Sequence, residues 1–283
     1  MTTGVEQPPA RAAAKRRPAV STAERARMSD SETAQLLDLL NKSDTVELKG
    51  TVPAEAHVAT IRGLPIDPIE AQIRQVFFFD TPDLALDKAG VVVRARRSQG
   101  GRGDTVVKLR PVQPDEMRAE LRKLPNFNVE VDVLPGGFVC SASLKGRTTV
   151  DAVRDVANGR LKLSKLFTKD QRAFFAQHAP DGVALDGLAV LGPTFVLKLA
   201  FDADVARFGR AKVQRVVAEL WLYPDGSRIL ELSLRCPTNQ AFQVAAEARA
   251  YLGERGIDLA AVQQTKTRAA LRFYAARLNS GAA

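Results

Sequence analysis

The sequence is poor in the residues that zinc sites and disulfide frameworks require. Its 283 residues include two cysteines, two histidines and one tryptophan, and aromatic residues make up only 6%. Cys140 and Cys236 are too few for a disulfide framework or a four-ligand zinc site. With His57 and His178 as its histidines, the chain is also a poor candidate for a Ser-His-Asp triad. These scarcities argue against zinc enzymes, disulfide scaffolds and serine hydrolases.

Long hydrophobic runs are missing too. No apolar stretch approaches the roughly 18 residues that a membrane-spanning helix needs. The N-terminal segment has no apolar core followed by a small-residue cleavage site, as a secretory signal would have. We therefore expect a cytoplasmic protein with no membrane partner.

Positive charge, by contrast, is abundant. Lys and Arg number 41 against 32 Asp and Glu, which gives a formal net charge of +9 at pH 7. Residues 1–27 contain six of the basic residues and two Glu, so the rest of the chain is also basic. An excess of this sign indicates an anionic partner: nucleic acid, a membrane surface or a phosphate-rich small molecule. The net charge alone does not choose among them.

The first 28 residues differ in composition from the remainder. Residues 1–28 are rich in Ala, Pro, Thr and Arg and show no apolar period, so we predict a disordered basic tail. Such a tail could contact nucleic acid, although a solubilising segment is the simpler interpretation. Residues 29–283 are expected to form the folded domain, whose oligomeric state the sequence leaves open.

Beyond the tail, period-two patterns alternate with glycine- and proline-rich turns, as in hairpin-linked strands. Helices are predicted at Ser29–Leu40 and Ala54–Arg62, in an insert at about 148–180 and at about 239–278. No βαβ alternation is present, so the predicted class is α+β, with eight or more strands in an antiparallel sheet that could close into a barrel. The predicted strands are Thr45–Thr51, Gln72–Asp80, Gly90–Ser98, Asp104–Pro111, Asn126–Val133, Phe138–Lys145, Phe195–Phe201, Val213–Tyr223 and Ser227–Arg235.

Charged residues recur at spacing i, i+2 on four of these strands. Residues two apart point to the same face of a strand. Most of the pairs carry one sign, whereas solvated sheet faces usually mix signs. The pairs are Glu47 with Lys49, Arg94 with Arg96, Lys108 with Arg110, and Glu130 with Asp132.

These pairs allow two interpretations. In the ordinary one the charged faces are in water and the intervening residues form the core. However, Ala95, Leu109 and Val131 between the charges are modest core residues. In the other interpretation the charged faces turn inward and line a polar cavity, where Lys and Arg bind phosphate oxygens and carboxylates hold a divalent cation.

Several segments together resemble the CYTH, or triphosphate tunnel metalloenzyme, superfamily. The most specific is the stretch from Phe78-Phe79-Asp80-Thr81-Pro82-Asp83 through Leu84 and Leu86 to Arg94-Ala95-Arg96. The resemblance covers roughly residues 43–275. The other segments are Val46–Lys49, similar to the Glu-x-Glu-x-Lys signature, Thr105–Arg110, the late acidic hairpin around Glu219 and Glu231, and Lys266 with Arg268.

The resemblance implies an eight-stranded antiparallel β-barrel, or tunnel, with peripheral α-helices and a polar interior. Family members act on triphosphate-bearing substrates with Mg²⁺ or Mn²⁺, and one branch cyclises ATP. We therefore expect a triphosphate, polyphosphate or nucleotide ligand. The same resemblance implies roles for individual residues: Lys49 as catalytic; Arg94, Arg96, Lys108, Arg110, Arg172, Lys198 and Lys266 as phosphate-binding; and Glu47 and Glu219 as metal ligands. Glu130 and Asp132, which share one strand face, are the further candidate metal ligands.

The sequence departs from the family pattern at two acidic positions. Thr45 stands where the first signature Glu is expected, and Trp221 stands two residues after Glu219, where a second Glu is usual. Because a hard cation needs several anionic oxygens, the metal site is expected to be weak.

Three functions follow from this. The first is a metal-dependent phosphohydrolase acting on triphosphate or polyphosphate. The second is a non-catalytic module that binds polyphosphate or a nucleotide. Adenylate cyclisation ranks last, because no residues specifying adenine are recognisable. The predicted helices outside the sheet could instead serve as a protein-interaction platform.

Overall fold

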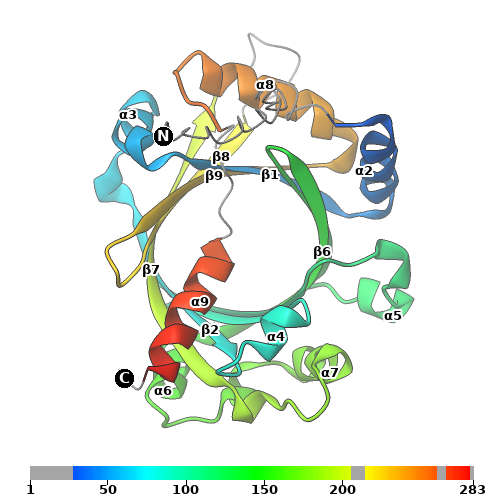
Figure 1. Cartoon of the computed structure of the whole chain (residues 1–283), viewed down its shortest axis with the longest axis vertical. Helices are drawn as coiled ribbons and strands as arrows, with labels where there is room; N and C mark the ends of the chain where they lie inside the picture. The colour runs from blue at the N-terminus through cyan, green and yellow to red at the C-terminus, as the bar shows by residue number, and fades with distance from the viewer. Residues whose placement is uncertain (1–27, 205–213, 260–265, 281–283) are drawn as a thin grey trace, which may run out of the picture.

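A closed barrel of nine strands forms the centre of the molecule (Figure 1). The computed structural model describes residues 28–204, 214–259 and 266–280; the predicted tail, apart from Met28, lies outside this range. Around the barrel the strand order is β1-β5-β6-β4-β3-β2-β7-β8-β9, and β9 closes the ring on β1. The strands are β1 (Thr45–Val52), β2 (Gln72–Asp80), β3 (Val91–Ser98), β4 (Arg102–Leu109), β5 (Phe127–Leu134), β6 (Gly137–Thr149), β7 (Ala189–Ala203), β8 (Gln214–Leu222) and β9 (Arg228–Cys236).

The strand number and one pairing differ from the expectation of eight antiparallel strands. Eight of the nine neighbouring pairs are antiparallel, but β1 and β5 are parallel, with Thr45 opposite Glu130 and Glu47 opposite Asp132. A ring with an odd number of strands cannot alternate in direction all the way round. One parallel pair is therefore unavoidable once nine strands close, and it brings β1 beside β5.

Two hairpins follow directly from the local sequence. The β3–β4 hairpin pairs Ser98 with Arg102, and its turn contains Gly100 and Gly101, which both have positive φ. The β5–β6 hairpin pairs Leu134 with Gly137 across Pro135-Gly136. Glycine adopts positive φ without a steric penalty, so these turns form where the glycines are.

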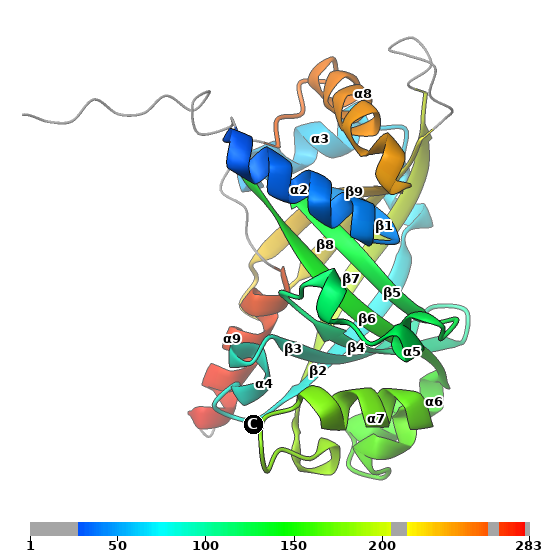
Figure 2. The same cartoon turned by 90° about the vertical axis from the view of Figure 1, so that its right-hand side faces the viewer.

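Helices surround the barrel and cover one of its ends (Figure 2). In both views α9 lies with α4 at the same end of the barrel, whereas α6 and α7 pack on its side. Among the described residues, no helix combines the length and the apolar composition needed to cross a bilayer. The helices are α2 (Asp30–Lys42), α3 (His57–Gly63), α4 (Ala85–Lys88), α5 (Ala119–Arg122), α6 (Val150–Ala157), α7 (Lys169–His178), α8 (Ala241–Gly253) and α9 (Lys266–Asn279).

Side-chain caps explain where two of these helices begin. The Ser29 hydroxyl accepts from the Glu32 amide, and the Glu32 carboxylate accepts from the Ser29 amide, which is a capping box at the start of α2. Thr168 and Gln171 form the same box for α7. The cap at Thr168 begins α7 inside the predicted insert at about 148–180, and residues Leu163–Leu166 before it form a separate 3₁₀ turn.

The main hydrophobic core lies between the outer face of the barrel and the helices. Ala95, Leu109 and Val131, which the sequence suggested were only modest core residues, are all buried in this core. Gln171 of α7 is completely buried there and donates to the carbonyls of Thr105 and Leu144. The outer face therefore packs like a protein interior, which leaves the alternate strand positions facing the inside of the barrel.

A second apolar cluster fills the end of the barrel beneath α9. It joins inward-facing Phe78 and Trp221 to Leu271 and Tyr274 of α9, and Phe78 and Trp221 are stacked with ring centroids 6.5 Å apart. Tyr274 also donates its hydroxyl to the carbonyl of Pro193. The C-terminal helix is thus attached to one end of the barrel by apolar burial.

Asp80, in the segment that carries the most specific sequence resemblance, has a structural role. It is almost fully buried and accepts backbone hydrogen bonds from Thr81, Leu86 and Asp87 at 2.7, 2.8 and 3.0 Å. Its carboxylate therefore fixes the turn from β2 into α4. Such a turn satisfies backbone donors that burial would otherwise leave without partners.

Candidate functional site

Strand alternation brings most of the predicted charged side chains to the inside of the barrel. On β3, Val93 and Ala95 pack outward, so Arg94 and Arg96 face inward. Residues paired across neighbouring strands lie on the same face of the sheet, so the strand registers identify the inward-facing residues of the other strands. Besides Arg94 and Arg96, the inward-facing charged residues include Glu47, Lys49, Arg74, Asp104, Lys108, Glu130, Asp132, Lys145, Lys198, Glu219, Glu231 and Arg235.

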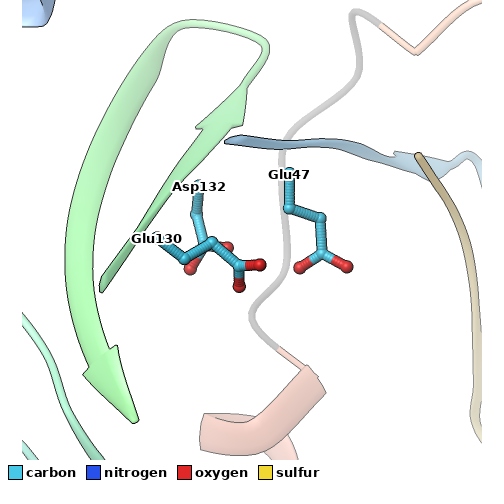
Figure 3. A group of neighbouring side chains, drawn as sticks. All are labelled: Glu47, Glu130 and Asp132. Atoms are coloured by element: carbon cyan, nitrogen blue, oxygen red, sulfur yellow. The ribbon is translucent and has the colours of Figure 1, made fainter. Parts of the chain in front are cut away.

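Three carboxylates, here called the carboxylate triad, meet where β1 and β5 pair. They belong to Glu47, Glu130 and Asp132, and one oxygen of each lies within 4.8 Å of the other two. Figure 3 shows Glu47 reaching in from β1 and the other two from β5. The parallel β1–β5 pairing, which no local pattern specifies, is what assembles the triad.

Asp132 is the most enclosed member of the triad and the one with most counter-charges. Its side chain is 0% exposed, and its oxygens lie 2.7 Å from Lys49 Nζ, 2.5 Å from Arg110 Nη2 and 3.4 Å from Lys108 Nζ. Burial opposes ionisation of Asp132, but Lys108, Lys49 and Arg110 outweigh it and hold its pKa well below the ordinary value. Asp132 is therefore an anion at the centre of three cations.

Glu47 and Glu130 differ in their electrostatic balance. Lys49 Nζ lies 2.6 Å from Glu47, and Arg235 Nε lies 2.8 Å from Glu130. Burial opposes ionisation of Glu47, yet Lys49 and Arg235 lower its pKa. For Glu130, burial and the neighbouring Glu47 raise the pKa. At Glu130, therefore, the neighbouring cations do not fully compensate for burial and for the negative charge of Glu47.

A second group of inward acids consists of Glu219 and Glu231, which are cross-strand neighbours on β8 and β9. Lys266, the first residue of α9, places Nζ 2.7 Å from Glu219 and 2.6 Å from Glu231. Glu219 also accepts from the Trp221 indole at 3.2 Å and lies 3.6 Å from Arg74. We call this group the Lys266-bridged pair. It is separate from the triad, with which Glu219 had been grouped as a metal ligand.

Arg94, Lys145 and Lys198 have no carboxylate partner among the described residues. The Nε atom of Arg94 is buried without a hydrogen bond, and burial together with nearby Arg96 lowers its pKa to about 10. Burial and nearby cations also lower the pKa of Lys198 and of Lys145. Lys198 lies opposite Glu219 in the β7–β8 register, but no ion pair joins them. These side chains supply positive charge on the inner face of the barrel that no carboxylate among the described residues pairs with, although Lys145 is exposed.

Two predicted phosphate-binding residues are placed differently from the rest. Arg96 forms an ion pair with Asp104 at 3.0 Å, so its charge is already compensated. Arg172 lies on α7, outside the barrel wall, and donates to the carbonyl of Phe167 at 2.6 Å. Its inclusion with the tunnel residues is not supported, because α7 packs on the outward face of β4 and β6 through Gln171.

Sequence reasoning missed several cations on the inward face, and three of them bear on the groups described above. Arg235 and Lys145 continue the alternation of β9 and β6, and extending the i, i+2 rule to single charges would have found them. Arg74 precedes the apolar part of β2, where the run of phenylalanines hid the alternation. Each contributes to the interior field: Arg235 at the triad, Arg74 near Glu219 and Lys145 unpaired.

The chemistry of the triad fits a hard divalent cation. Mg²⁺ and Mn²⁺ prefer oxygen ligands, and three carboxylates supply them from one side. Oδ1 of Asp132 is buried and accepts no well-aligned hydrogen bond, although Lys49 Nζ is nearby. A cation would also relieve the repulsion that raises the pKa of Glu130. The Lys266-bridged pair does not fit a second cation, because both of its carboxylates are bonded to one ammonium group, whereas the ammonium of Lys49 leaves Glu130 of the triad outside its bridge.

No family model matches the chain, and a search of curated proteins finds no match to its sequence. Two solved structures are similar over most of their length. One is HpAC1 from Hippeastrum, a candidate adenylyl cyclase with a dominant triphosphatase activity, at 16% identity and a TM-score of 0.56 over 84% of this chain and 96% of that one. The other is a candidate adenylate cyclase from Bacillus halodurans, at 11% identity and 0.55 over 80% and 97%. The chain therefore has the closed-barrel fold of these two proteins.

Proposed function

We propose that this chain is a divergent member of the CYTH superfamily that binds a triphosphate or polyphosphate inside the barrel and hydrolyses a phosphoanhydride bond with Mg²⁺ or Mn²⁺. The observation that carries the proposal is the set of inward cations without carboxylate partners, Arg94 above all. An unpaired cation with a buried nitrogen is costly, because burial removes solvation that no carboxylate among the described residues replaces. An anionic ligand removes that cost.

The distribution of these cations favours a linear phosphate chain over a single anion. Arg94, Lys145 and Lys198 come from β3, β6 and β7, which lie in different parts of the ring. Successive phosphoryl groups provide several separate sets of oxygens for charge-assisted hydrogen bonds. The fold shared with HpAC1, which has a triphosphatase activity, supports the same substrate class.

Glu47, Glu130 and Asp132 would hold the divalent cation. When bound there, it would neutralise charge on the transferred phosphoryl group. Lys49, within 2.7 Å of both Glu47 and Asp132, orients these two carboxylates. Burial opposes protonation of Lys49, but Asp132 and Glu47 outweigh it and raise its pKa. Lys49 therefore remains a cation and acts by charge and positioning rather than as a base.

A non-catalytic binding module is the second candidate function. It is favoured by the ion pairs of Lys49 with both Glu47 and Asp132, which satisfy part of the triad without a metal. Adenylate cyclisation stays behind both, because the inward-facing residues are dominated by charges and specify no base.

Phosphate release and ligand binding must be measured separately to test the proposal. Inorganic triphosphate, long-chain polyphosphate and nucleoside triphosphates are each incubated with Mg²⁺, Mn²⁺ or a chelator. Calorimetric titration of triphosphate in chelator measures binding alone. The matched variants are Arg94→Met, inside the barrel, and Arg172→Met, on its outer side.

The proposed hydrolase releases phosphate only with metal, and Arg94→Met, unlike Arg172→Met, weakens binding. Tight binding without release identifies the non-catalytic module. If neither variant changes triphosphate affinity, or triphosphate does not bind, the interior is not the ligand site.

A further inference from the structure

The Lys266-bridged pair contains a complete ionic arrangement that uses no metal. Glu219 and Glu231 stand directly opposite each other on antiparallel strands, a position where like charges repel. Lys266 Nζ lies 2.7 Å from one carboxylate and 2.6 Å from the other, and 5.0 Å from the centre of the Trp221 ring. An ammonium group has three donors. Two are directed to carboxylates, and the aromatic face adds further attraction for the charge.

The position of Lys266 is fixed by its surroundings. The Tyr223 hydroxyl donates to the backbone carbonyl of Lys266 at 2.9 Å, and Leu271 and Tyr274 of α9 are buried against the end of the barrel. Burial opposes protonation of Lys266, but Glu219 and Glu231 outweigh it and raise its pKa. The ammonium is therefore a permanent cation held in place by a helix.

We infer that Lys266 replaces a divalent cation between Glu219 and Glu231, so that the barrel interior has a single exchangeable cation site, at the carboxylate triad. The statement that the barrel has one cation site rests on the proposed function, which places a metal at the triad. The statement that no cation binds at the Lys266-bridged pair does not depend on the proposed function. The contrast between the two groups supports the inference. Lys49 also bridges two carboxylates of the triad, Glu47 and Asp132, at 2.6 and 2.7 Å, but the third carboxylate, Glu130, lies outside that bridge. In the other group, one ammonium is bonded to both carboxylates, Glu219 and Glu231.

This inference also changes the role expected for Lys266. A phosphate-binding lysine needs donors that are free to reach phosphate oxygens. Lys266 uses its charge on two carboxylates, so it stabilises the docking of α9 instead of contacting the ligand. Ligand phosphates would then meet Arg94 and Lys198, which have no such partners among the described residues.

Removal of the ammonium should create a metal site that the wild type lacks. In Lys266→Met the two carboxylates remain, with a neutral side chain of similar length between them. The matched control is Lys198→Met, which also removes one inward ammonium but releases no carboxylate, because Lys198 has no ion pair in the described structure. Mn²⁺ binding to metal-stripped protein is counted by electron paramagnetic resonance.

The chain's single tryptophan locates the added ion. Trp221 donates its indole N–H to Glu219, so Mn²⁺ between Glu219 and Glu231 should quench its fluorescence. We expect one Mn²⁺ in the wild type and in Lys198→Met, and two in Lys266→Met, where the added ion quenches the indole. If the wild type binds no Mn²⁺ and Lys266→Met binds one ion that quenches the indole, the exclusion of a cation by Lys266 is supported and the proposed metal at the triad is contradicted.

Three results would overturn the inference. They are two ions in the wild type, an unchanged count in Lys266→Met without new quenching, and equal quenching in Lys198→Met. If Lys266→Met does not fold, Glu231→Gln provides the test in an otherwise native chain. Because the pair binds no metal in the wild type, this isosteric change should leave the Mn²⁺ count unaltered; loss of one ion contradicts the inference.

Discussion

The carboxylate triad and the Lys266-bridged pair lie on the same inner face of one barrel, yet their charges are balanced differently. In the triad, cations from β1, β4 and β9 surround acids on β1 and β5. In the pair, a single lysine from α9, outside the sheet, bridges two acids on neighbouring strands. The triad depends on how the ring of strands closes, and the Lys266-bridged pair depends on how α9 docks.

The difference lies in how many cations balance each acidic group. The counter-ions of the triad are shared, so displacement of one still leaves Asp132 paired. The counter-ion of the pair is a single ammonium attached to a packed helix. The predictions below test this contrast, from the largest expected effect to the smallest.

The largest effect is expected for Asp132→Asn. This change leaves Lys49, Lys108 and Arg110 facing a neutral amide in a position that is 0% exposed. Removing one member of a buried ionic group costs about 3–5 kcal/mol, and the free energy of unfolding should fall by that amount. Urea denaturation measures it, and added triphosphate should restore stability more in the variant than in the wild type.

The control for this change lies in the other group. Glu231→Gln leaves Glu219 to balance Lys266, so its loss of stability should be smaller than that of Asp132→Asn. An equal or larger loss would show that the pair, and not the triad, is the main ionic support of the barrel.

Arg94→Met should weaken binding of triphosphate in chelator by roughly 10- to 100-fold. One charge-assisted contact contributes about 1.5–3 kcal/mol, and in the described part of the chain no carboxylate pairs with Arg94 that its removal would release. Stability should be unchanged or higher, because the variant no longer buries an unpaired nitrogen. Calorimetry and urea denaturation together test both parts, with Arg172→Met as the control; lost stability with unchanged affinity would contradict the prediction.

The Lys266-bridged pair should contribute stability that disappears in acid. Burial opposes ionisation of Glu219, but Lys266 outweighs it and lowers its pKa below the ordinary 4.5. A carboxyl group with a lowered folded-state pKa stabilises the fold above its unfolded pKa, and the contribution is lost as the pH falls through the folded value.

Comparison of the wild type with Glu219→Gln tests this pH dependence. The difference in unfolding free energy should be complete at pH 6, shrink below about 4.5 and vanish at lower pH. A difference that stays constant down to the acid limit would mean that Glu219 contributes through packing alone.

Thr45→Glu should produce the smallest effect, a several-fold rise in Mn²⁺ affinity at the triad. Thr45 is opposite Glu130 in the β1–β5 register, and its hydroxyl lies 3.4 Å from the Glu130 carboxylate. A fourth anionic oxygen donor raises the affinity for a hard cation. The neutral Thr45→Gln is the control for size. Equal affinity in both variants would indicate that ligand charge does not limit metal binding here.

Local patterns predicted the strands well. Gln72–Asp80 is a strand with the predicted bounds, and the Gly100–Gly101 and Pro135–Gly136 turns lie where predicted. Backbone geometry explains the success, because alternation and positive-φ turns depend on neighbouring residues only. Arg172 shows the limit of such patterns. Its charge is visible in the sequence, but the sequence does not show that Gln171 beside it is the residue that packs α7 on the barrel. That role is visible only in the hydrogen bonds of Gln171 to the carbonyls of Thr105 and Leu144.

The sequence by itself determined which side chains share a strand face, where the chain turns and which strands carry paired charges. Only the tertiary structure decided which acids meet. The triad joins Thr45–Val52 to Phe127–Leu134 through the one parallel pairing of an odd-numbered ring, and Glu219 meets Lys266 through a helix 47 residues further along the chain. Such contacts depend on ring closure and helix docking. Burial of the apolar outer face and of the α9 cluster decides where distant segments lie, and a local sequence period does not contain this information.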